Sequence, residues 1–529
     1  MQASGQQRDT SRDGLRNTVE AVVLTGFRPF WAFVNRTNWL ARIANRLIVN
    51  IAVLKAPCRP LALSTQAPYT NWATLTDRTW FSRYLPPAPQ DTLPPASEVA
   101  SLFKLRPERP PVLSDRSTLL FPSFAQWFTD GFLMTDADRR RTRTNHQIDL
   151  SQLYGLDPTV TAVLRRRSEL PGEKGKLKSV NSGKGEWAPP LYDAAGVRDP
   201  TFALVPEPTH LPSDWPIEKR AALFAFGGER ANSTAFTAAI NTLFLREHNR
   251  ICAMLERDNP GWDDERVFQT ARNINIVLLI KLVVEEYINH ISPYWMKLLA
   301  DPTPTYTARW NRENWIPVEF NLLYRWHSLV PTSATWGSAS VDFAGLRFDN
   351  RTLLQDGLVT ALAGASQTPA WRIGLFNTAP MLDGVEVASI QQGRENRLAG
   401  YNDYRVVFKY PRVTRFEQIS GDPLVVSELR RIYSDVDRIE FFAGLFAEEL
   451  PSRSAVPALI GRMVAADAFS HALTNPLLSP QVYHAGTFTT TGMEVIEKNA
   501  TLADLLARND VVPAGTRISM EVDGYRSLA

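Results

Sequence analysis

Two long segments with the periodicity of amphipathic helices constrain the fold of this chain more than any other feature. Over residues 235–258 and 263–300, apolar side chains recur at positions i, i+3, i+4 and i+7. Residues 424–450 show the same pattern, and the alternation typical of strands is scarce. The sequence therefore predicts a mainly α fold, built around one large helical domain.

The chain divides into three predicted regions. Residues 1–17 are polar and are expected to be disordered, residues 18–84 form an amphipathic helical segment, and residues 85–529, which open with Pro-rich stretches, form the catalytic domain. Within 18–56, Arg and Trp interrupt apolar residues at helical spacing, and Pro29 divides the stretch into short helices. Such helices can lie in a membrane interface or pack on the body of the protein, and the composition favours neither.

Several classes of protein are excluded by composition and targeting signals. A net charge of +3 over 529 residues does not suggest nucleic-acid binding. Two distant cysteines, Cys58 and Cys252, make neither a disulfide scaffold nor a zinc site. The polar N-terminus lacks the apolar core of a secretory signal, and no run of about 18 apolar residues predicts a spanning helix. We expect a cytoplasmic protein, or one peripheral on a membrane.

One short motif carries the chemistry. Tyr324 and His327 occur in EFNLLYRWHSLVP, near the predicted C-terminus of a helix, and residues three apart share one helix face. A histidine that binds haem iron, with a tyrosine beside the same pocket, is a workable oxidase arrangement. A lone histidine is more often structural, so the motif by itself leaves both readings open.

The segments around this motif resemble the cyclooxygenases, the prostaglandin endoperoxide synthases, within the animal haem peroxidase superfamily. The resemblance is strongest over residues 246–295 and 319–331. It extends in the expected order from residue 17 to about 508, through FAQWFTDGFLMTD, IDLSQLYG and NPLLSPQVYHAGTFTTTGMEVIEKNATLADLL. It implies a large helical haem domain with N-terminal amphipathic helices that face a membrane, in a branch like the bacterial fatty-acid dioxygenases.

The resemblance also implies roles for particular residues. Tyr324 matches the radical tyrosine, and His327 matches the proximal iron ligand. Tyr294 matches the tyrosine that hydrogen-bonds the radical tyrosine. Asn402 matches the residue that supports the proximal histidine, and Arg405 matches an arginine that pairs with a haem propionate; a capped turn and a surface charge are the alternatives for this pair. Thr135 and Trp326 are expected to line the haem site.

The distal side departs from the family pattern. Gln126 stands in its expected place, but Asp130 occupies the position of the catalytic histidine. Arg230 matches a distal arginine of the mammalian peroxidases, a position where cyclooxygenases have none. A buried Asp130 with a raised pKa could move a proton, whereas pairing with Arg230 would hold it ionised.

Further departures bear on cofactors and substrate. Ser233 and Thr234 stand where mammalian peroxidases form covalent haem esters, so we expect non-covalent haem b. Gly131 replaces a calcium-binding aspartate, so no calcium is expected. The substrate-binding arginine of cyclooxygenases falls on Val53, and nearby Lys55 is the candidate for the fatty-acid carboxylate, with a snorkelling surface lysine as the alternative.

The sequence thus predicts a haem-dependent oxygenase that adds O₂ to an unsaturated fatty acid through a tyrosyl radical, after activation by a hydroperoxide. One alternative is a haem peroxidase that oxidises small substrates with hydrogen peroxide. The other is a haem-binding protein without turnover, for which the loss of the distal histidine argues. Monotopic membrane contact and a homodimer are compatible with the resemblance, and a nucleic-acid partner is not expected.

Overall fold

The structure is a computed structural model of the chain, and it describes residues 22–54, 63–90, 92–498 and 501–525. The predicted disordered region 1–17, Lys55 and Cys58 lie outside the described residues. Within the described part, the predicted mainly α fold is confirmed. Its strands form small two-stranded antiparallel sheets: β1 (Leu63–Ser64) with β2 (Ser82–Arg83), β3 (Leu113–Thr118) with β8 (Pro369–Trp371), β4 (Val180–Ser182) with β5 (Gly185–Trp187), and β6 (Ser333–Trp336) with β7 (Ala339–Asp342).

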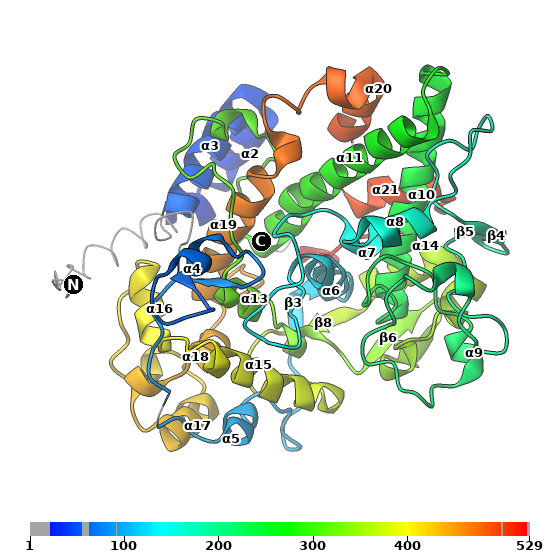
Figure 1. The fold of residues 1–529 in the computed structure, drawn as a ribbon. Helices are drawn as coiled ribbons and strands as arrows, with labels where there is room; N and C mark the ends of the chain where they lie inside the picture. Colours follow the sequence, from blue (N-terminus) through cyan, green and yellow to red (C-terminus); the bar gives the residue numbers. More distant parts are fainter. Residues whose placement is uncertain (1–21, 55–62, 91, 499–500, 526–529) are drawn as a thin grey trace.

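The core is organised around helix α10 (Ala235–Asp258), which is buried on nearly all sides. Thr234 caps the start of the helix through a reciprocal capping box with Thr237, and the helix ends at Asp258. Both bounds of the predicted segment 235–258 are therefore confirmed. A helix surrounded by protein has no solvent face to satisfy, which explains its apolar residues on several sides. It packs against α11 (Asp264–Leu282), α6 (Leu120–Phe132) and α14 (Arg351–Gln367) (Figure 1).

The segment 263–300 is helical over most of its predicted length. Helix α11 continues through a π-helical turn, Val283–Ile288, into α12 (Asn289–Ile291), after which Ser292 turns to an extended conformation. Asp264–Ile291 is the one helix of the described chain that is long and apolar enough to cross a membrane, but 78% of its most apolar window is buried inside the protein. A core helix has this composition as well, and its burial accounts for it here.

The prediction of one helix over 424–450 is wrong. Helix α17 (Pro423–Tyr433) ends at Ser434, whose φ of 57° places it in the left-handed region. The chain then passes through a 3₁₀ turn, Val436–Arg438, before α18 (Phe441–Ala447) begins. The helical spacing of apolar residues continues across this break because both helices turn apolar faces to the same core.

Helices α2 (Arg28–Arg36) and α3 (Asn38–Leu54) form a separate layer at one end of the molecule, drawn in blue in Figure 1. Helix α3 packs against α19 (Ala458–Leu473). The side-chain amide of Asn45 donates to the Leu299 carbonyl at 3.0 Å and accepts from its N–H at 3.1 Å, which fixes the layer to the body. The layer also exposes large apolar side chains, of which Phe33 and Trp39 do not line the apolar cavity described below.

The remaining helices frame the site or complete the periphery. Two of them, α13 (Val318–Leu323) and α15 (Asp383–Glu395), pack against each other and carry residues of the site. The others are α4 (Trp72–Thr76), α5 (Ala96–Ala100), α7 (Ser151–Tyr154), α8 (Pro158–Leu164), α9 (Ile217–Arg220), α16 (Tyr401–Val407), α20 (Ala485–Lys498) and α21 (Leu502–Asn509).

Candidate functional site

The segment that carries Tyr324 and His327 is not one continuous helix. Helix α13 ends at Leu323, Tyr324 has φ −90° and ψ 7°, and Trp326 has φ −86° and ψ 48°. His327 then begins a separate 3₁₀ turn, His327–Leu329. The expectation that the tyrosine and the histidine share a helix face is therefore wrong, although His327 does lie just beyond a helix C-terminus.

A carboxylate lies within ion-pair distance of His327, although the contact does not have the geometry of a hydrogen bond. Its Nδ1 lies 3.1 Å from Oε1 of Glu386, a residue of α15 whose side chain is 1% exposed. The hydroxyl of Thr378 donates to the same oxygen at 3.0 Å. A carboxylate at Nδ1 fixes the imidazole tautomer and leaves Nε2 available for a metal.

Asn402, the expected support for this histidine, is engaged elsewhere. Its amide donates to the Val413 carbonyl at 2.9 Å and to Asp437 at 2.6 Å, and its oxygen accepts from the Val413 N–H. Glu386 takes the place predicted for Asn402. The sequence offers no signal for Glu386, because a glutamate early in a helix normally faces solvent.

Tyr324 lies in an aromatic environment that excludes water. Its residue exposure is 9%, and its ring lies 4.9 Å from that of Trp326 and 5.1 Å from that of Phe320. Burial raises the pKa of the Tyr324 phenol well above its ordinary value, the Asp467 carboxylate raises it further, and the neighbouring Tyr287 hydroxyl lowers it in part. The phenol is therefore neutral at any physiological pH.

The tyrosine that accompanies Tyr324 is Tyr287, which the sequence analysis missed. Tyr287 is fully buried in the π-helical turn, and its hydroxyl interacts with that of Tyr324. Tyr294, predicted for this role, instead lines the apolar cavity described below. That prediction is wrong because the helix ends at Ile291, so Tyr294 belongs to the following turn.

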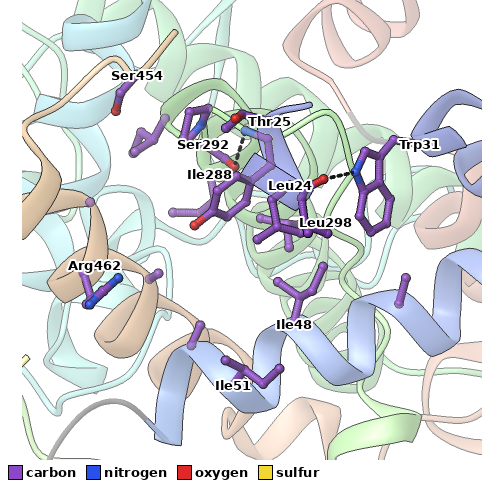
Figure 2. A pocket seen from close by; sticks show the side chains of 18 of the residues that line it. Leu24, Thr25, Trp31, Ile48, Ile51, Ile288, Ser292, Leu298, Ser454 and Arg462 are labelled. Atoms are coloured by element: carbon purple, nitrogen blue, oxygen red, sulfur yellow. Dashed lines mark hydrogen bonds between the residues drawn. The ribbon is translucent and has the colours of Figure 1, made fainter. Parts of the chain in front are cut away.

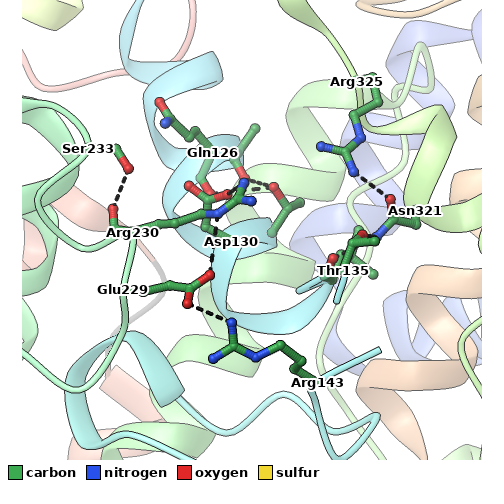
Figure 3. Close-up of polar contacts among 12 residues, drawn as sticks. Gln126, Asp130, Thr135, Arg143, Glu229, Arg230, Ser233, Asn321 and Arg325 are labelled. Atoms are coloured by element: carbon green, nitrogen blue, oxygen red, sulfur yellow. Dashed lines mark hydrogen bonds and ion pairs between the residues drawn. The ribbon is translucent and has the colours of Figure 1, made fainter. Parts of the chain in front are cut away.

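Charged side chains gather in one cluster (Figure 3), and the small cavity among them is also lined by Tyr324. Asp130, on α6, forms an ion pair with Arg230 at 3.2 Å, and Gln126 lies one helical turn before it. Burial raises the pKa of Asp130, and Arg230 offsets part of that shift. Both effects anticipated from the sequence thus act on this carboxyl, and burial is the larger.

A second arginine, Arg325, faces the same cluster. Burial, together with the smaller effect of the positive charge of Arg230, lowers the pKa of Arg325 to about 10. Arg325 donates to Asn321 Oδ1 at 2.8 Å, and the Asn321 amide donates to the Thr135 hydroxyl at 3.0 Å. Thr135 therefore lies beside the charged cluster, and its predicted place at the haem stays a prediction.

Arg405 lies in a different environment from the one predicted. It forms an ion pair with Glu448 at 2.6 Å and a hydrogen bond to the Tyr401 hydroxyl at 3.0 Å. Its guanidinium is thus committed to a buried carboxylate. The structure instead brings Arg230 and Arg325 to the cluster beside Tyr324.

The donor set fits a haem. His327 has the carboxylate partner typical of a metal-ligating histidine, and the buried Nε of Arg325 and Nε1 of Trp326 form no hydrogen bond within the described chain. Guanidinium groups suit the carboxylates of such a cofactor. In this conformation, the cavity between Asp130, Arg230 and Tyr324 measures about 30 Å³, so these side chains must separate to admit a planar group.

A much larger cavity lies between the N-terminal layer and α19 (Figure 2). Its volume is about 1280 Å³, and apolar side chains such as Ile48, Ile51, Leu298 and Phe469 make up most of its wall. The cavity extends to Ile288, the residue that directly follows Tyr287. An apolar space of this size suits a lipid-like ligand. Lys55, the predicted carboxylate ligand, follows α3 but lies outside the described residues.

A family model described as animal haem peroxidase matches residues 136–518, well over half of the chain. This protein belongs to the animal haem peroxidase family. Membership makes it a haem-dependent oxidoreductase and confirms the resemblance seen in the sequence.

Relatives of this haem peroxidase place it near the cyclooxygenases. Prostaglandin G/H synthase 2 of Bos taurus is 31% identical over 516 residues, which cover 93% of this chain and 80% of that protein. Prostaglandin G/H synthase 1 of Oryctolagus cuniculus is 32% identical over 507 residues, with 92% and 79% covered. These relatives support a family of fatty-acid oxygenases and peroxidases.

Solved structures agree on the fold. Peroxidase A from Dictyostelium discoideum has a TM-score of 0.66 at 18% identity and covers 87% of this chain and 99% of that chain. Fatty acid alpha-dioxygenase from Arabidopsis thaliana has a TM-score of 0.65 at 15% identity, with 94% and 90% covered. At these identities the likeness shows the fold alone.

Proposed function

We propose that this chain is a haem-dependent oxygenase that adds O₂ to an unsaturated fatty acid through a radical on Tyr324. The observation that carries the proposal is the position of Tyr324. It is a buried phenol that joins the charged cluster to Tyr287, whose neighbour Ile288 lines the large apolar cavity. Its relatives among the prostaglandin G/H synthases support the same reading.

Bound haem would supply the oxidising equivalent after reaction with a hydroperoxide, with His327 as its ligand and Glu386 as the partner of that ligand. Because burial keeps the Tyr324 phenol protonated, its oxidation must release a proton together with the electron. The radical then takes a hydrogen atom from a fatty-acid carbon, which restores the phenol. O₂ adds to the carbon radical, and the peroxyl radical recovers a hydrogen atom from Tyr324 to give a hydroperoxide.

We infer non-covalent haem b without calcium at Gly131. The side chains at the two ester positions are hydroxyls that are already engaged: Ser233 donates to the Arg230 carbonyl at 2.7 Å, and Thr234 caps α10. Neither can form an ester with a haem methyl group as a carboxylate does. Gly131 has no side chain to ligate an ion, and its surface packs against Ser151 and Gln152.

A monotopic membrane contact fits the exposed apolar face of α2 and α3. Phe33 is 61% exposed and Trp39 63%, on helices that also carry Arg36, Arg42 and Arg46. Aromatic and apolar side chains beside arginines suit the boundary between lipid tails and headgroups. The apolar cavity lies directly behind this face, so a fatty acid could enter it from a bilayer.

The alternative function is that of a peroxidase acting on small substrates, and the Asp130–Arg230 pair favours it. Burial raises the pKa of Asp130, which would let it move a proton, and Arg230 could stabilise a developing negative charge. This alternative predicts rapid oxidation of phenols by hydrogen peroxide and indifference to fatty acids.

Oxygen uptake by the haem-loaded protein separates the two functions. With an unsaturated fatty acid and a trace of hydroperoxide, we expect uptake that requires the lipid. Tyr324→Phe should reduce uptake to background while the haem absorbance spectrum stays unchanged, because the phenol carries the radical. The matched control is Tyr433→Phe. Tyr433 is a buried tyrosine at the end of α17, and its hydroxyl donates to Glu440 at 3.0 Å. Uptake that persists in Tyr324→Phe would refute the radical role.

A further inference from the structure

The wall of the apolar cavity contains one charged side chain. Among the described residues that line it, every side chain is apolar or neutral except Arg462, in the second turn of α19. Figure 2 shows Arg462 at the edge of the cavity, on the side opposite Trp31. Placing a guanidinium against an apolar space is unfavourable unless something compensates its charge.

The structure holds Arg462 in place without neutralising it. Its Nη1 donates to the Phe408 carbonyl at 2.9 Å, and its guanidinium lies over the Tyr410 ring, 4.0 Å from the ring centre. No carboxylate of the described chain forms an ion pair with it. Most other arginines around the interior have one, as Arg405 has Glu448 and Arg394 has Glu440. One face of the Arg462 guanidinium is thus fixed by stacking, and part of its fork of donors is uncommitted.

We infer that Arg462 binds the carboxylate of the fatty acid, an inference that rests on the proposed function. An anionic headgroup would supply the missing counter-charge, and the hydrocarbon tail would fill the apolar space between α3 and α19. Tyr410 and the Phe408 carbonyl are positioning groups, because they orient the guanidinium toward the cavity. The role predicted for Lys55 passes to an arginine on a different helix.

The orientation of the substrate follows from this placement. With the carboxylate at Arg462, the tail runs past Ile48 of α3 toward Ile288, the residue next to Tyr287. The methylene groups farthest from the head then approach the Tyr287–Tyr324 pair. An arginine matches the two carboxylate oxygens with two parallel donors, so the head is fixed in direction as well as in position.

The test compares binding of hexadecanoic acid with binding of its methyl ester, using the haem-loaded full chain. Neither ligand is an unsaturated substrate, so binding is measured without turnover. Arg462→Gln should weaken binding of the acid by about 10- to 100-fold, the loss expected for a charge-assisted hydrogen bond, and change binding of the ester by less than about twofold. Arg462→Lys should fall between, since a lysine keeps the charge and loses the fork.

Two further variants make the result specific. Lys55→Gln removes the rival cation, and Arg46→Gln removes an exposed charge on α3 that does not line the cavity; both should bind the acid as the wild type does. Unchanged acid binding in Arg462→Gln, equal losses of acid and ester, or an acid-specific loss in Lys55→Gln would each overturn the inference. Unchanged ester binding shows that Arg462→Gln is folded.

The two proposals fail in distinguishable ways. Tight, Arg462-dependent binding of the acid without oxygen uptake from any unsaturated acid would overturn the proposed oxygenase and support the carboxylate site. A wild type that binds neither the acid nor the ester would overturn the carboxylate site, while oxygen uptake with an unsaturated acid decides the oxygenase separately.

Discussion

Glu386 offers the sharpest test of the haem site, because nothing in the sequence marked it. The substitution Glu386→Gln keeps the shape of the side chain and removes its charge. The Gln oxygen can still accept from the Thr378 hydroxyl and can stay 3.1 Å from Nδ1 of His327, so the positions of both contacts are preserved. What changes is the negative charge that the imidazole experiences.

The size of the effect follows from the burial of this pair. With Glu386 only 1% exposed, water does little to screen its carboxylate from the His327 imidazole 3.1 Å away. Loss of such a partner typically costs about 10- to 100-fold in metal affinity, or ~1.4–2.8 kcal/mol. We therefore expect haem affinity to fall within this range. The midpoint potential should rise, because a less basic imidazole stabilises ferric iron less.

Haem titration followed by absorbance gives the affinity, and a redox titration gives the potential. Glu395→Gln is the matched control, because Glu395 ends the same helix and pairs with Arg139 at the surface, 2.7 Å away. Thermal unfolding of the apoprotein checks that the fold is intact. If affinity and potential in Glu386→Gln both equal those of the control variant, Glu386 does not act on the ligand of the iron, and the assignment of His327 loses its main structural support.

Two other predictions concern stability and membranes. Burial raises the pKa of Glu286 from 4.5 to about 7 in the folded chain, so the unfolded chain ionises first as pH rises, and the stability of the fold decreases between those two pH values. In Glu286→Gln the side-chain oxygen can still accept from the Leu502 N–H, so the variant should unfold at the same temperature as the wild type at pH 4 and at a higher temperature at pH 8. An equal difference in unfolding temperature at both pH values would contradict this. Phe33→Ser and Trp39→Ser, at exposed positions of α2 and α3 that do not line the cavity, should each weaken sedimentation with lipid vesicles by about tenfold, since each removes one apolar side chain from the interface. The control Leu170→Ser, on an equally exposed loop residue, should have no effect.

Much of the helical framework could be predicted from periodicity alone. Helix α10 matches its predicted bounds because a capping residue, Thr234, and a long apolar pattern coincide. The break inside 424–450 could not be predicted, because a left-handed Ser434 depends on tertiary contacts and carries no Gly or Pro signal. Helix periodicity and residue propensity therefore predict the helices well and the breaks between them poorly.

The confusion between Tyr287 and Tyr294 has a geometric cause. Residues seven apart occupy the same face of an α-helix, so the pattern places both tyrosines on the side that meets Tyr324. The π-helical turn at Val283–Ile288 and the end of α12 at Ile291 then separate them. A single sequence cannot show where an α-helix passes into a π-helical turn, and that local irregularity decides which of the two tyrosines lies beside Tyr324.

The partners of His327 were beyond prediction for another reason. Tyr324, Arg325 and His327 lie within four consecutive residues, so their proximity is a local property that a motif conveys. Glu386 and Asn402 come from α15 and α16, far along the chain, and only the packing of those helices determines which of the two reaches the imidazole. A residue that tertiary packing brings to the site can be identified only from a contact in the structure, here the 3.1 Å separation between Oε1 of Glu386 and Nδ1 of His327.

The arrangement also bears on where the proposed oxidation takes place. Tyr287 and Ile288 are consecutive, yet one meets Tyr324 and the other lines the apolar cavity. The charged cluster of Asp130, Arg230 and Arg325 lies beside Tyr324 and does not line the described wall of that cavity. A fatty acid in the cavity is therefore separated from the haem side by phenol rings. In the proposed function, Tyr324 is the residue that would carry the oxidising equivalent from the side of the charged cluster toward the lipid tail.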